Sequence, residues 1–315
     1  MAQIDAASDA RWLQSIDAVY ALFEDDRLRA QYPHLAAKVE KAVRLTEEAY
    51  RDVGIPQCAL SFNGGKDCTV IVHILAAVLR RLSGLSQLSA NGASSSSSSS
   101  SSSTPSSSTS QLPPIPTVYI ACESPFATLE DFIRDSQRRY NLDLYTVRGG
   151  MKEGLIEYFE GGGDQGVPGS EAKQRETTSS KRDRRDVKAI FIGTRRTDPN
   201  GESLQDRQMT DPSWPQVERI HVILDWDYPD VWAFLRCPAL AADSGSEGVP
   251  YCQLYDEGYT SLGSTFNTFP NPILKSREVG EKGAYRPAWQ LEDGSSERAG
   301  RGDKPREGKE EKKES

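Results

Sequence analysis

Residues 61–70 hold the side chains best suited to chemistry, in the order Ser-Phe-Asn-Gly-Gly-Lys-Asp-Cys-Thr-Val. Gly64 and Gly65 allow a tight turn whose amide N–H groups can approach phosphate oxygens closely. An apolar run precedes the turn at 57–62, and apolar side chains recur at helical spacing over 68–80. Because a helix N-terminus carries partial positive charge, this arrangement predicts a phosphate-binding loop, with an ordinary strand-to-helix turn as the alternative.

A second polar segment, Gly-Thr-Arg-Arg-Thr-Asp-Pro, occupies residues 193–199 and follows an apolar run at 187–193. Arg195 and Arg196 offer planar sets of donors that suit phosphate or the polar rim of a heterocycle. Asp198 can accept hydrogen bonds from a ligand. Taken alone, the segment also fits a surface turn, but its place after a strand favours a ligand site.

Two further segments combine side chains that suit a ligand pocket. Residues 250–263 alternate aromatic rings with glycines and small hydroxyl residues, a composition that packs well against a planar ligand or in an aromatic core. In the segment 285–301, Arg298 and Arg301 are three residues apart and flank Ala-Gly. Both arginines can lie on one face and bind an anion, and a solvated basic tail is the alternative.

Apolar periodicity predicts that strands and helices alternate along the chain. Two amphipathic helices come first, then strands at 57–62, 117–122, 142–147 and 187–193, separated by helices at 68–80, 126–141 and 152–159. This alternation is typical of an α/β fold with a doubly wound, mostly parallel sheet. Ligands of such sheets bind at the carboxyl ends of the strands, which is where the first two polar segments are expected to lie.

Two segments interrupt this order. Residues 83–116 include ten consecutive serines, and residues 161–186 are rich in glycine and then in charge, so neither can bury enough apolar surface to fold. We expect both to be disordered insertions in one domain, 57–275. The remaining parts expected are N-terminal helices in 1–56, an extension over 276–301 that closes the active site, and a disordered charged tail, 302–315.

Composition argues against several classes of partner. The formal net charge of -8 lacks the basic surplus that nucleic-acid binding usually requires. Five cysteines without a C-x-x-C, and three histidines isolated in sequence, indicate neither a disulfide framework nor a zinc site. No apolar run reaches membrane-spanning length, and the acidic N-terminus is unlike a secretory or transit peptide. We expect a cytoplasmic protein that binds neither nucleic acid nor membrane.

The loop differs from a Walker A motif, because Leu60 stands where that motif has Gly and Asp67 follows the lysine where it has Ser or Thr. It resembles instead the PP-loop of the ATP pyrophosphatases, which split ATP between the α and β phosphates. Together with the three other segments, it resembles the fungal and animal type of FAD synthase, or FMN adenylyltransferase, in the PAPS-reductase-like branch of that fold. The resemblance covers about 35–301 outside the insertions, and Phe-Asn-Gly-Gly-Lys-Asp at 62–67 is this family's form of the loop.

The resemblance implies that a phosphate oxygen of FMN attacks the α-phosphorus of ATP in line, giving FAD and pyrophosphate. Since this nucleophile is already anionic, positioning and charge neutralisation suffice. The ATP site implied is Ser61, Phe62, Asn63, Gly64, Gly65, Lys66 and Asp67, with Asp67 organising Mg²⁺. The flavin site implied is Arg195, Arg196, Thr197, Asp198, Arg298 and Arg301, and the catalytic set is Asn63, Lys66, Asp67, Asp198 and Arg298. Transfer of FAD to apo-flavoproteins is also implied.

Two other functions fit the same fold. A PAPS-reductase-like oxidoreductase depends on a C-terminal Cys in a Glu-Cys-Gly context, whereas Cys252 is the last cysteine here. A non-catalytic flavin- or nucleotide-binding module would lose the lysine or acid of the loop, and both Lys66 and Asp67 are present. A tRNA-thiolating enzyme is disfavoured by the acidic balance and the lack of C-x-x-C.

Overall fold

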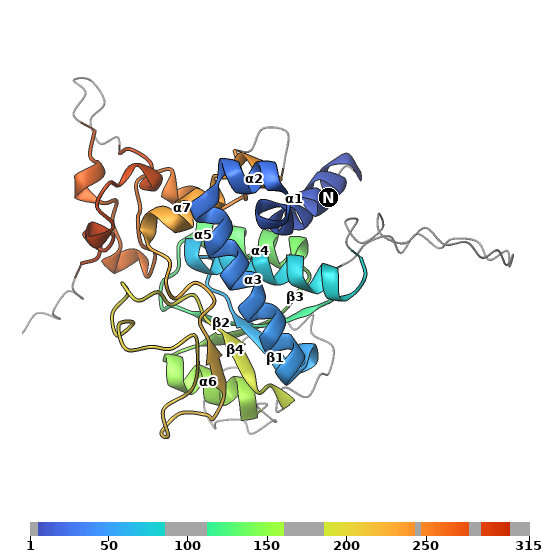
Figure 1. Ribbon diagram of the computed structural model, residues 1–315. Helices are drawn as coiled ribbons and strands as arrows, with labels where there is room; N and C mark the ends of the chain where they lie inside the picture. Colours follow the sequence, from blue (N-terminus) through green and yellow to red (C-terminus); the bar gives the residue numbers. More distant parts are fainter. Residues whose placement is uncertain (1–5, 86–111, 161–185, 243–246, 277–284, 303–315) are drawn as a thin grey trace, which may run out of the picture.

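The computed structural model describes residues 6–85, 112–160, 186–242, 247–276 and 285–302 (Figure 1). Its centre is a six-stranded sheet in the order β3-β2-β1-β4-β6-β5. The strands are β1 (Cys58–Ser61), β2 (Ile115–Ala121), β3 (Leu142–Arg148), β4 (Ala189–Phe191), β5 (Arg207–Met209) and β6 (Glu218–Ile220). All neighbouring strands pair parallel except β5 and β6, which are antiparallel. The predicted α/β fold with a mostly parallel sheet is therefore confirmed.

Helices cover both faces of the sheet (Figure 1). They are α1 (Ala6–Glu24), α2 (Asp26–Gln31), α3 (Pro33–Val53), α4 (Lys66–Leu82), α5 (Ala127–Arg139), α6 (Met151–Glu160) and α7 (Tyr228–Leu235). The larger cluster of buried apolar side chains joins α1, α3, α4, α5 and α7 to one face, and a smaller cluster joins α6 to the other. Because side chains alternate along a strand, Cys58 and Leu60 enter the larger cluster and Ala59 the smaller one.

The N-terminal helices pack on α4 through both apolar and ionic contacts. In α3, apolar side chains are buried at three- and four-residue spacing, and the helix ends at Gly54, whose φ of 96° suits glycine. Between α1 and α4, Arg80 forms a buried two-armed ion pair with Asp17, with Nε–Oδ1 and Nη2–Oδ2 both at 2.9 Å. Removing either partner would leave a buried charge unpaired, so this pair fixes how α1 lies against α4.

The structure differs from the sequence-based expectations in several places. The N-terminal region holds three helices rather than two, and β5, β6 and α7 were not expected. Ile115 and Pro116 belong to β2, where they pair with Leu142 and Asp143. The C-terminal boundary predicted for the insertion 83–116 is therefore wrong, because its last two residues belong to the sheet. Most of that insertion, most of 161–186 and the tail from 303 lie outside the described residues.

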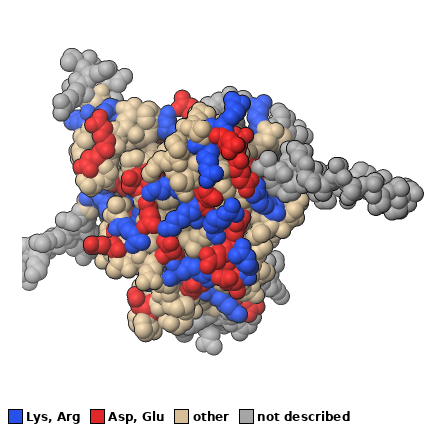
Figure 2. All heavy atoms as spheres, viewed as in Figure 1, with Lys and Arg blue, Asp and Glu red and all other residues tan. Residues whose placement is uncertain are grey.

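Charged side chains of both signs are interspersed on the face shown in Figure 2. Ion pairs between surface side chains include Arg81–Glu24 and Lys41–Asp225. A mixed surface of this kind produces no large field of one sign on that face. Among the described residues, no helix is long and apolar enough to cross a membrane.

Candidate active site

The loops that follow β1 and β4 meet at the point where the strand order reverses. The chain runs from β1 through β2 to β3 on one side of the sheet and then returns to place β4 on the other side of β1. In doubly wound folds, ligands bind at this reversal, outside the carboxyl ends of the strands. A Cβ atom at Gly193 would lie 3.1 Å from Cys68 Sγ and 3.3 Å from Cys68 N, so glycine lets the two loops pack closely.

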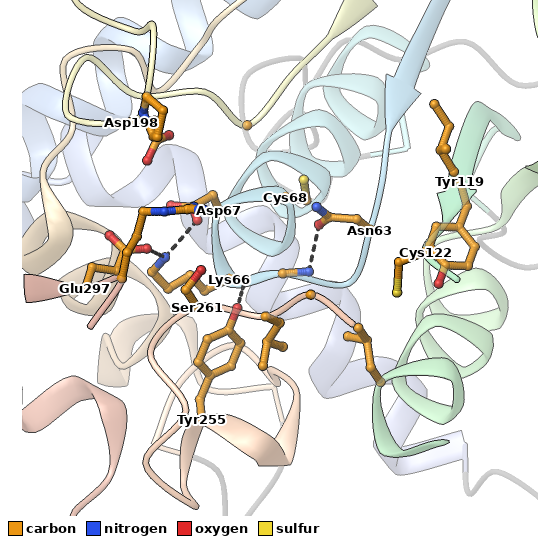
Figure 3. A pocket seen from close by; sticks show the side chains of 18 residues that line it. Asn63, Lys66, Asp67, Cys68, Tyr119, Cys122, Asp198, Tyr255, Ser261 and Glu297 are labelled. Carbon is orange, nitrogen blue, oxygen red and sulfur yellow. Dashed lines mark hydrogen bonds and ion pairs between the residues drawn. The ribbon is translucent and has the colours of Figure 1, made fainter. Parts of the chain in front are cut away.

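The loop after β1 is held in a defined shape by two hydrogen bonds and by the close approach of Gly64 to α5. Asn63 Oδ1 accepts a hydrogen bond from the Gly65 N–H at 2.9 Å, and Tyr255 Oη accepts one from the Lys66 N–H at 2.8 Å (Figure 3). Gly64 has a φ of 71°, and a Cβ there would lie 2.8 Å from side-chain atoms of Leu129 and of its neighbour on α5, Ile133. Both the backbone conformation and the space therefore require glycine at position 64.

Five charged side chains form one network at the start of α4, and Lys66, Asp67, Asp198 and Glu297 of this network are labelled in Figure 3. Lys66 Nζ donates to Asp67 Oδ2 at 2.9 Å and to Glu297 Oε1. Arg195 Nη2 donates to Asp198 Oδ1 at 3.0 Å and to Glu297 Oε2 at 2.5 Å. The Lys66 and Arg195 side chains are only 2% and 1% exposed, so the cations depend on these carboxylates.

The charges of this network lower the pKa of Asp67 and raise the pKa of Arg195. Burial alone would raise the pKa of Asp67, but Lys66 and Arg195 outweigh burial and hold that pKa below its usual range. Burial would lower the pKa of Arg195, and the carboxylates of Asp67, Glu297 and Asp198 raise it instead. Asp67 is therefore ionised and Arg195 is charged at neutral pH.

Two cavities adjoin this network. The first has a volume of about 280 Å³ and opens on the loop after β1, and the second has a volume of about 540 Å³ and adjoins the start of α7. Asp198, Glu297 and Arg298 line both cavities. The first is also lined by Asn63, Gly65, Lys66, Asp67, Tyr119 and Leu262, and the second by Thr197, Asp227, Tyr228 and Ser295. Two molecules bound in the two cavities would meet at the shared wall.

Arg298 and Arg301 extend this site from the C-terminal segment. Within the described parts of the chain, neither arginine has a carboxylate within ion-pair distance. Burial and the nearby charge of Arg298 both lower the pKa of Arg301. The Arg301 guanidinium lies against the backbone at Gly263, which lines the first cavity. Two neighbouring cations that no carboxylate of the described residues neutralises form a region that attracts anions.

Comparison with known proteins decides the family. A probable FAD synthase from Schizosaccharomyces pombe is 30% identical over 267 residues, which cover 85% of this chain and 80% of that protein. The chain belongs to the FAD synthase family. Residues 57–270 also match the phosphoadenosine phosphosulfate reductase domain family. A probable FAD synthase from Caenorhabditis briggsae is 30% identical over 291 residues, and the chain spans 92% of its own length but only 45% of that longer protein.

Solved structures show the same fold as this FAD synthase family member. Candida glabrata FMN adenylyltransferase, solved in complex with FAD and inorganic pyrophosphate, superposes with a TM-score of 0.65 at 24% identity, covering 94% of this chain and 98% of that one. Yeast FAD synthetase in complex with FAD superposes with a TM-score of 0.62 at 23% identity, covering 93% of this chain and 99% of that one. At these identities the likeness concerns the fold.

The structure brings most of the predicted site residues together. The first cavity is lined by Asn63, Gly65, Lys66, Asp67, Asp198 and Arg298, and the second by Thr197, Asp198 and Arg298. Arg195 is buried and pairs with the carboxylates of Asp67 and Asp198.

Six predicted residues line neither cavity; Arg195 and Arg301 lie close to the site, as described above, and the other four lie elsewhere. Phe62 is fully buried in the apolar core, and Ser61 contacts Cys68 through its carbonyl oxygen. Gly64 faces α5. Arg196 points to the surface, where its Nε donates to Asp225 Oδ1 at 2.5 Å.

Glu297 is the principal site residue that the sequence did not suggest. It stands directly before Arg298, and its carboxylate contacts both buried cations of the network. Tyr255 was expected only as part of an aromatic wall, whereas its hydroxyl accepts the Lys66 N–H. The sequence offered one signal for Glu297, which is its position directly before Arg298, an arginine predicted to bind phosphate.

Proposed function

We propose that this protein is an FAD synthase that transfers AMP from ATP to the phosphate of FMN, with release of pyrophosphate. The observation that carries this proposal is the pair of cavities with a common wall of Asp198, Glu297 and Arg298 beside the loop of Lys66. ATP occupies the first cavity, with its phosphates on the loop after β1. FMN occupies the second, with its phosphate at the shared wall. In this proposal the two reacting groups lie side by side.

The chain's own residues supply positioning and positive charge. An oxygen of the FMN phosphate forms a bond to the α-phosphorus of ATP, and the bond between the α-phosphorus and the bridging oxygen breaks. Pyrophosphate leaves with that electron pair. Because the attacking oxygen is already anionic, no side chain has to remove a proton. Lys66 and the Gly65 turn bind the departing phosphates, while Arg298 neutralises charge between the two substrates.

Asp67 is the residue best placed to hold Mg²⁺ in this proposal. Its Oδ1 accepts no hydrogen bond within the described residues, although Arg195 Nε lies 3.1 Å away. Across that part of the chain, no three His, Cys, Asp or Glu residues lie close enough to enclose a metal ion. This fits Mg²⁺, which commonly takes one or two carboxylates and completes its shell with substrate phosphates and water. The ion would neutralise charge on the β and γ phosphates.

The test is direct synthesis of FAD. The protein is incubated with FMN, Mg²⁺ and ATP labelled at the α-phosphate, and we expect the label in FAD and unlabelled pyrophosphate in equal amount. Label released as AMP without FAD would contradict the proposal and indicate a simple ATP pyrophosphatase. The PAPS-reductase alternative is not favoured, because the curated relatives described above are FAD synthases.

Two finer aspects of this function are part of the proposal. We propose that the enzyme acts in the cytoplasm and delivers FAD to apo-flavoproteins. Delivery is tested by mixing the enzyme loaded with FAD with an apo-flavoprotein and comparing the rate of holoprotein formation with that from free FAD at the same concentration. A rate no higher than with free FAD would contradict direct delivery.

A further inference from the structure

The carboxylate of Glu297 bridges the two buried cations of the site. Its Oε1 accepts a hydrogen bond from Lys66 Nζ (Figure 3), and its Oε2 accepts one from Arg195 Nη2 at 2.5 Å. These charge-assisted contacts are the type that phosphate oxygens make with lysine and arginine. Glu297 therefore presents two anionic oxygens to Lys66 and Arg195, as a bound phosphate group would.

The backbone around Glu297 is fixed by contacts that do not involve its side chain. Thr260 Oγ1 donates to the Glu297 carbonyl oxygen at 2.6 Å, and Asn271 Nδ2 donates both to Thr260 Oγ1 at 3.0 Å and to the Ser296 carbonyl oxygen at 2.9 Å. Asn271 is fully buried. The Glu297 side chain lines both cavities, so it can change rotamer into either space while its backbone stays in place.

The charge balance of the network opposes phosphate binding while Glu297 is in this position. Two cations, Lys66 and Arg195, face three carboxylates, those of Asp67, Asp198 and Glu297. A phosphate group that approaches Lys66 and Arg195 would therefore meet one more carboxylate than cation within this network; Arg298 lines the same cavities but takes no part in these ion pairs. Once the Glu297 carboxylate withdraws, the cations and carboxylates are equal in number, and both cations regain a free donor.

We infer that Glu297 is a positioning residue whose carboxylate takes the place of a substrate phosphate in the substrate-free enzyme. It holds Lys66 and Arg195 in their binding positions, and the incoming phosphate displaces it. This inference rests on the proposed function, because it assigns these two cations to phosphate groups. Movement of Glu297 also couples the two substrates. Its neighbour in the chain, Arg298, lines both cavities, so a change at Glu297 is felt in each of them.

Inorganic pyrophosphate is the probe, because its binding can be measured without any reaction. We compare E297Q with the wild type by isothermal titration calorimetry in the presence of Mg²⁺. The amide keeps the shape but competes poorly for the cations, so pyrophosphate should bind about 10- to 100-fold more tightly, the range that corresponds to one charge-assisted hydrogen bond. E292Q is the matched control, because it removes an exposed acid from the same segment, and its affinity should equal that of the wild type. Unchanged or weaker binding by E297Q would overturn the inference.

Two further measurements separate this role from a purely structural one. E297D keeps the charge but is one methylene shorter, so it can reach only one cation well, and its affinity for pyrophosphate should lie between those of the wild type and E297Q. If E297Q does not fold, tighter binding by E297D supports the inference and unchanged binding overturns it. A lower Tm of the variants with unchanged pyrophosphate affinity would show that Glu297 serves stability alone. Failure of the wild type to make FAD would refute the proposed function and leave this binding test intact.

Discussion

The sharpest test of the site is the contrast between two arginines that lie close together in it. Arg298 is exposed, lines both cavities and has no carboxylate partner within the described residues. Arg195 is buried and contacts Asp198 and Glu297. If Arg298 acts on substrate phosphates, Arg298→Ala should lower activity and leave stability unchanged, whereas Arg195→Ala should lower both.

The magnitudes follow from these surroundings. Truncating an exposed side chain changes the free energy of unfolding by about 0.5 kcal/mol or less, which corresponds to about 2 °C or less in Tm for a protein of this size. Loss of a donor that acts in the transition state costs roughly 10²- to 10³-fold in kcat. Removing the buried Arg195 leaves Asp198 without its cation, and Asp67 and Glu297 with Lys66 alone, at a cost of about 3–5 kcal/mol of stability.

The assay is steady-state FAD formation at varied FMN, together with thermal unfolding of each variant. Arg298→Lys should recover part of the lost kcat/KM, because lysine keeps the charge but not the planar pair of donors. Arg286→Ala is the matched control, since Arg286 is an exposed arginine of the same segment that lines neither cavity, and it should behave as the wild type. Wild-type kinetics of Arg298→Ala would refute the assignment of this residue to the substrate phosphates.

Three other variants test separate parts of the site and core. Asp67→Asn should lower kcat by about 100-fold or more at saturating Mg²⁺ while the protein stays folded, and near-normal FAD synthesis would contradict a catalytic loop. Gly193→Val should weaken ATP binding and cost about 1–3 kcal/mol in urea unfolding, because its Cβ would press on Cys68 at 3.1 Å. Burial lowers the pKa of His73 to about 4 from its ordinary 6.5, so the unfolded chain binds the proton first as the pH falls. Stability should therefore drop by about 3 kcal/mol between pH 6.5 and 4, and His73→Gln should remove this part of the pH dependence.

The central elements could be predicted because their sequences repeat apolar residues at one clear period. The expected helix at 68–80 lies inside α4, and the expected strand at 57–62 contains β1. β5 and β6 could not be predicted, because each has three residues and both carry polar side chains. They are joined by a cross-strand ion pair in which Arg207 Nε and Nη2 each donate to a Glu218 oxygen at 2.9 Å. Such a pair stabilises strands only in the correct register, and the register is a property of the fold.

The two adjacent arginines after β4 show what sequence alone leaves open at the site. Arg195 turns inward because Asp198 accepts both its backbone N–H, at 2.8 Å, and its guanidinium. Arg196 turns outward because Asp225, which also pairs with Lys41, accepts its guanidinium on the surface. Both arginines have the same chemistry, so their positions depend on carboxylates that the fold brings near.

The position of Glu297 could not be inferred from the sequence for a related reason. Its partners lie 231 and 102 residues earlier in the chain, at the ends of two different strands. Phosphate-binding cations are recognisable in a sequence by their motifs, but the group that neutralises them before substrate arrives has no motif. Two buried cations cannot stay unpaired without a large cost in stability. Asp67 and Asp198 each accept a hydrogen bond from one of the two cations, and Glu297 takes up the further donors of both, where an incoming phosphate would contact them.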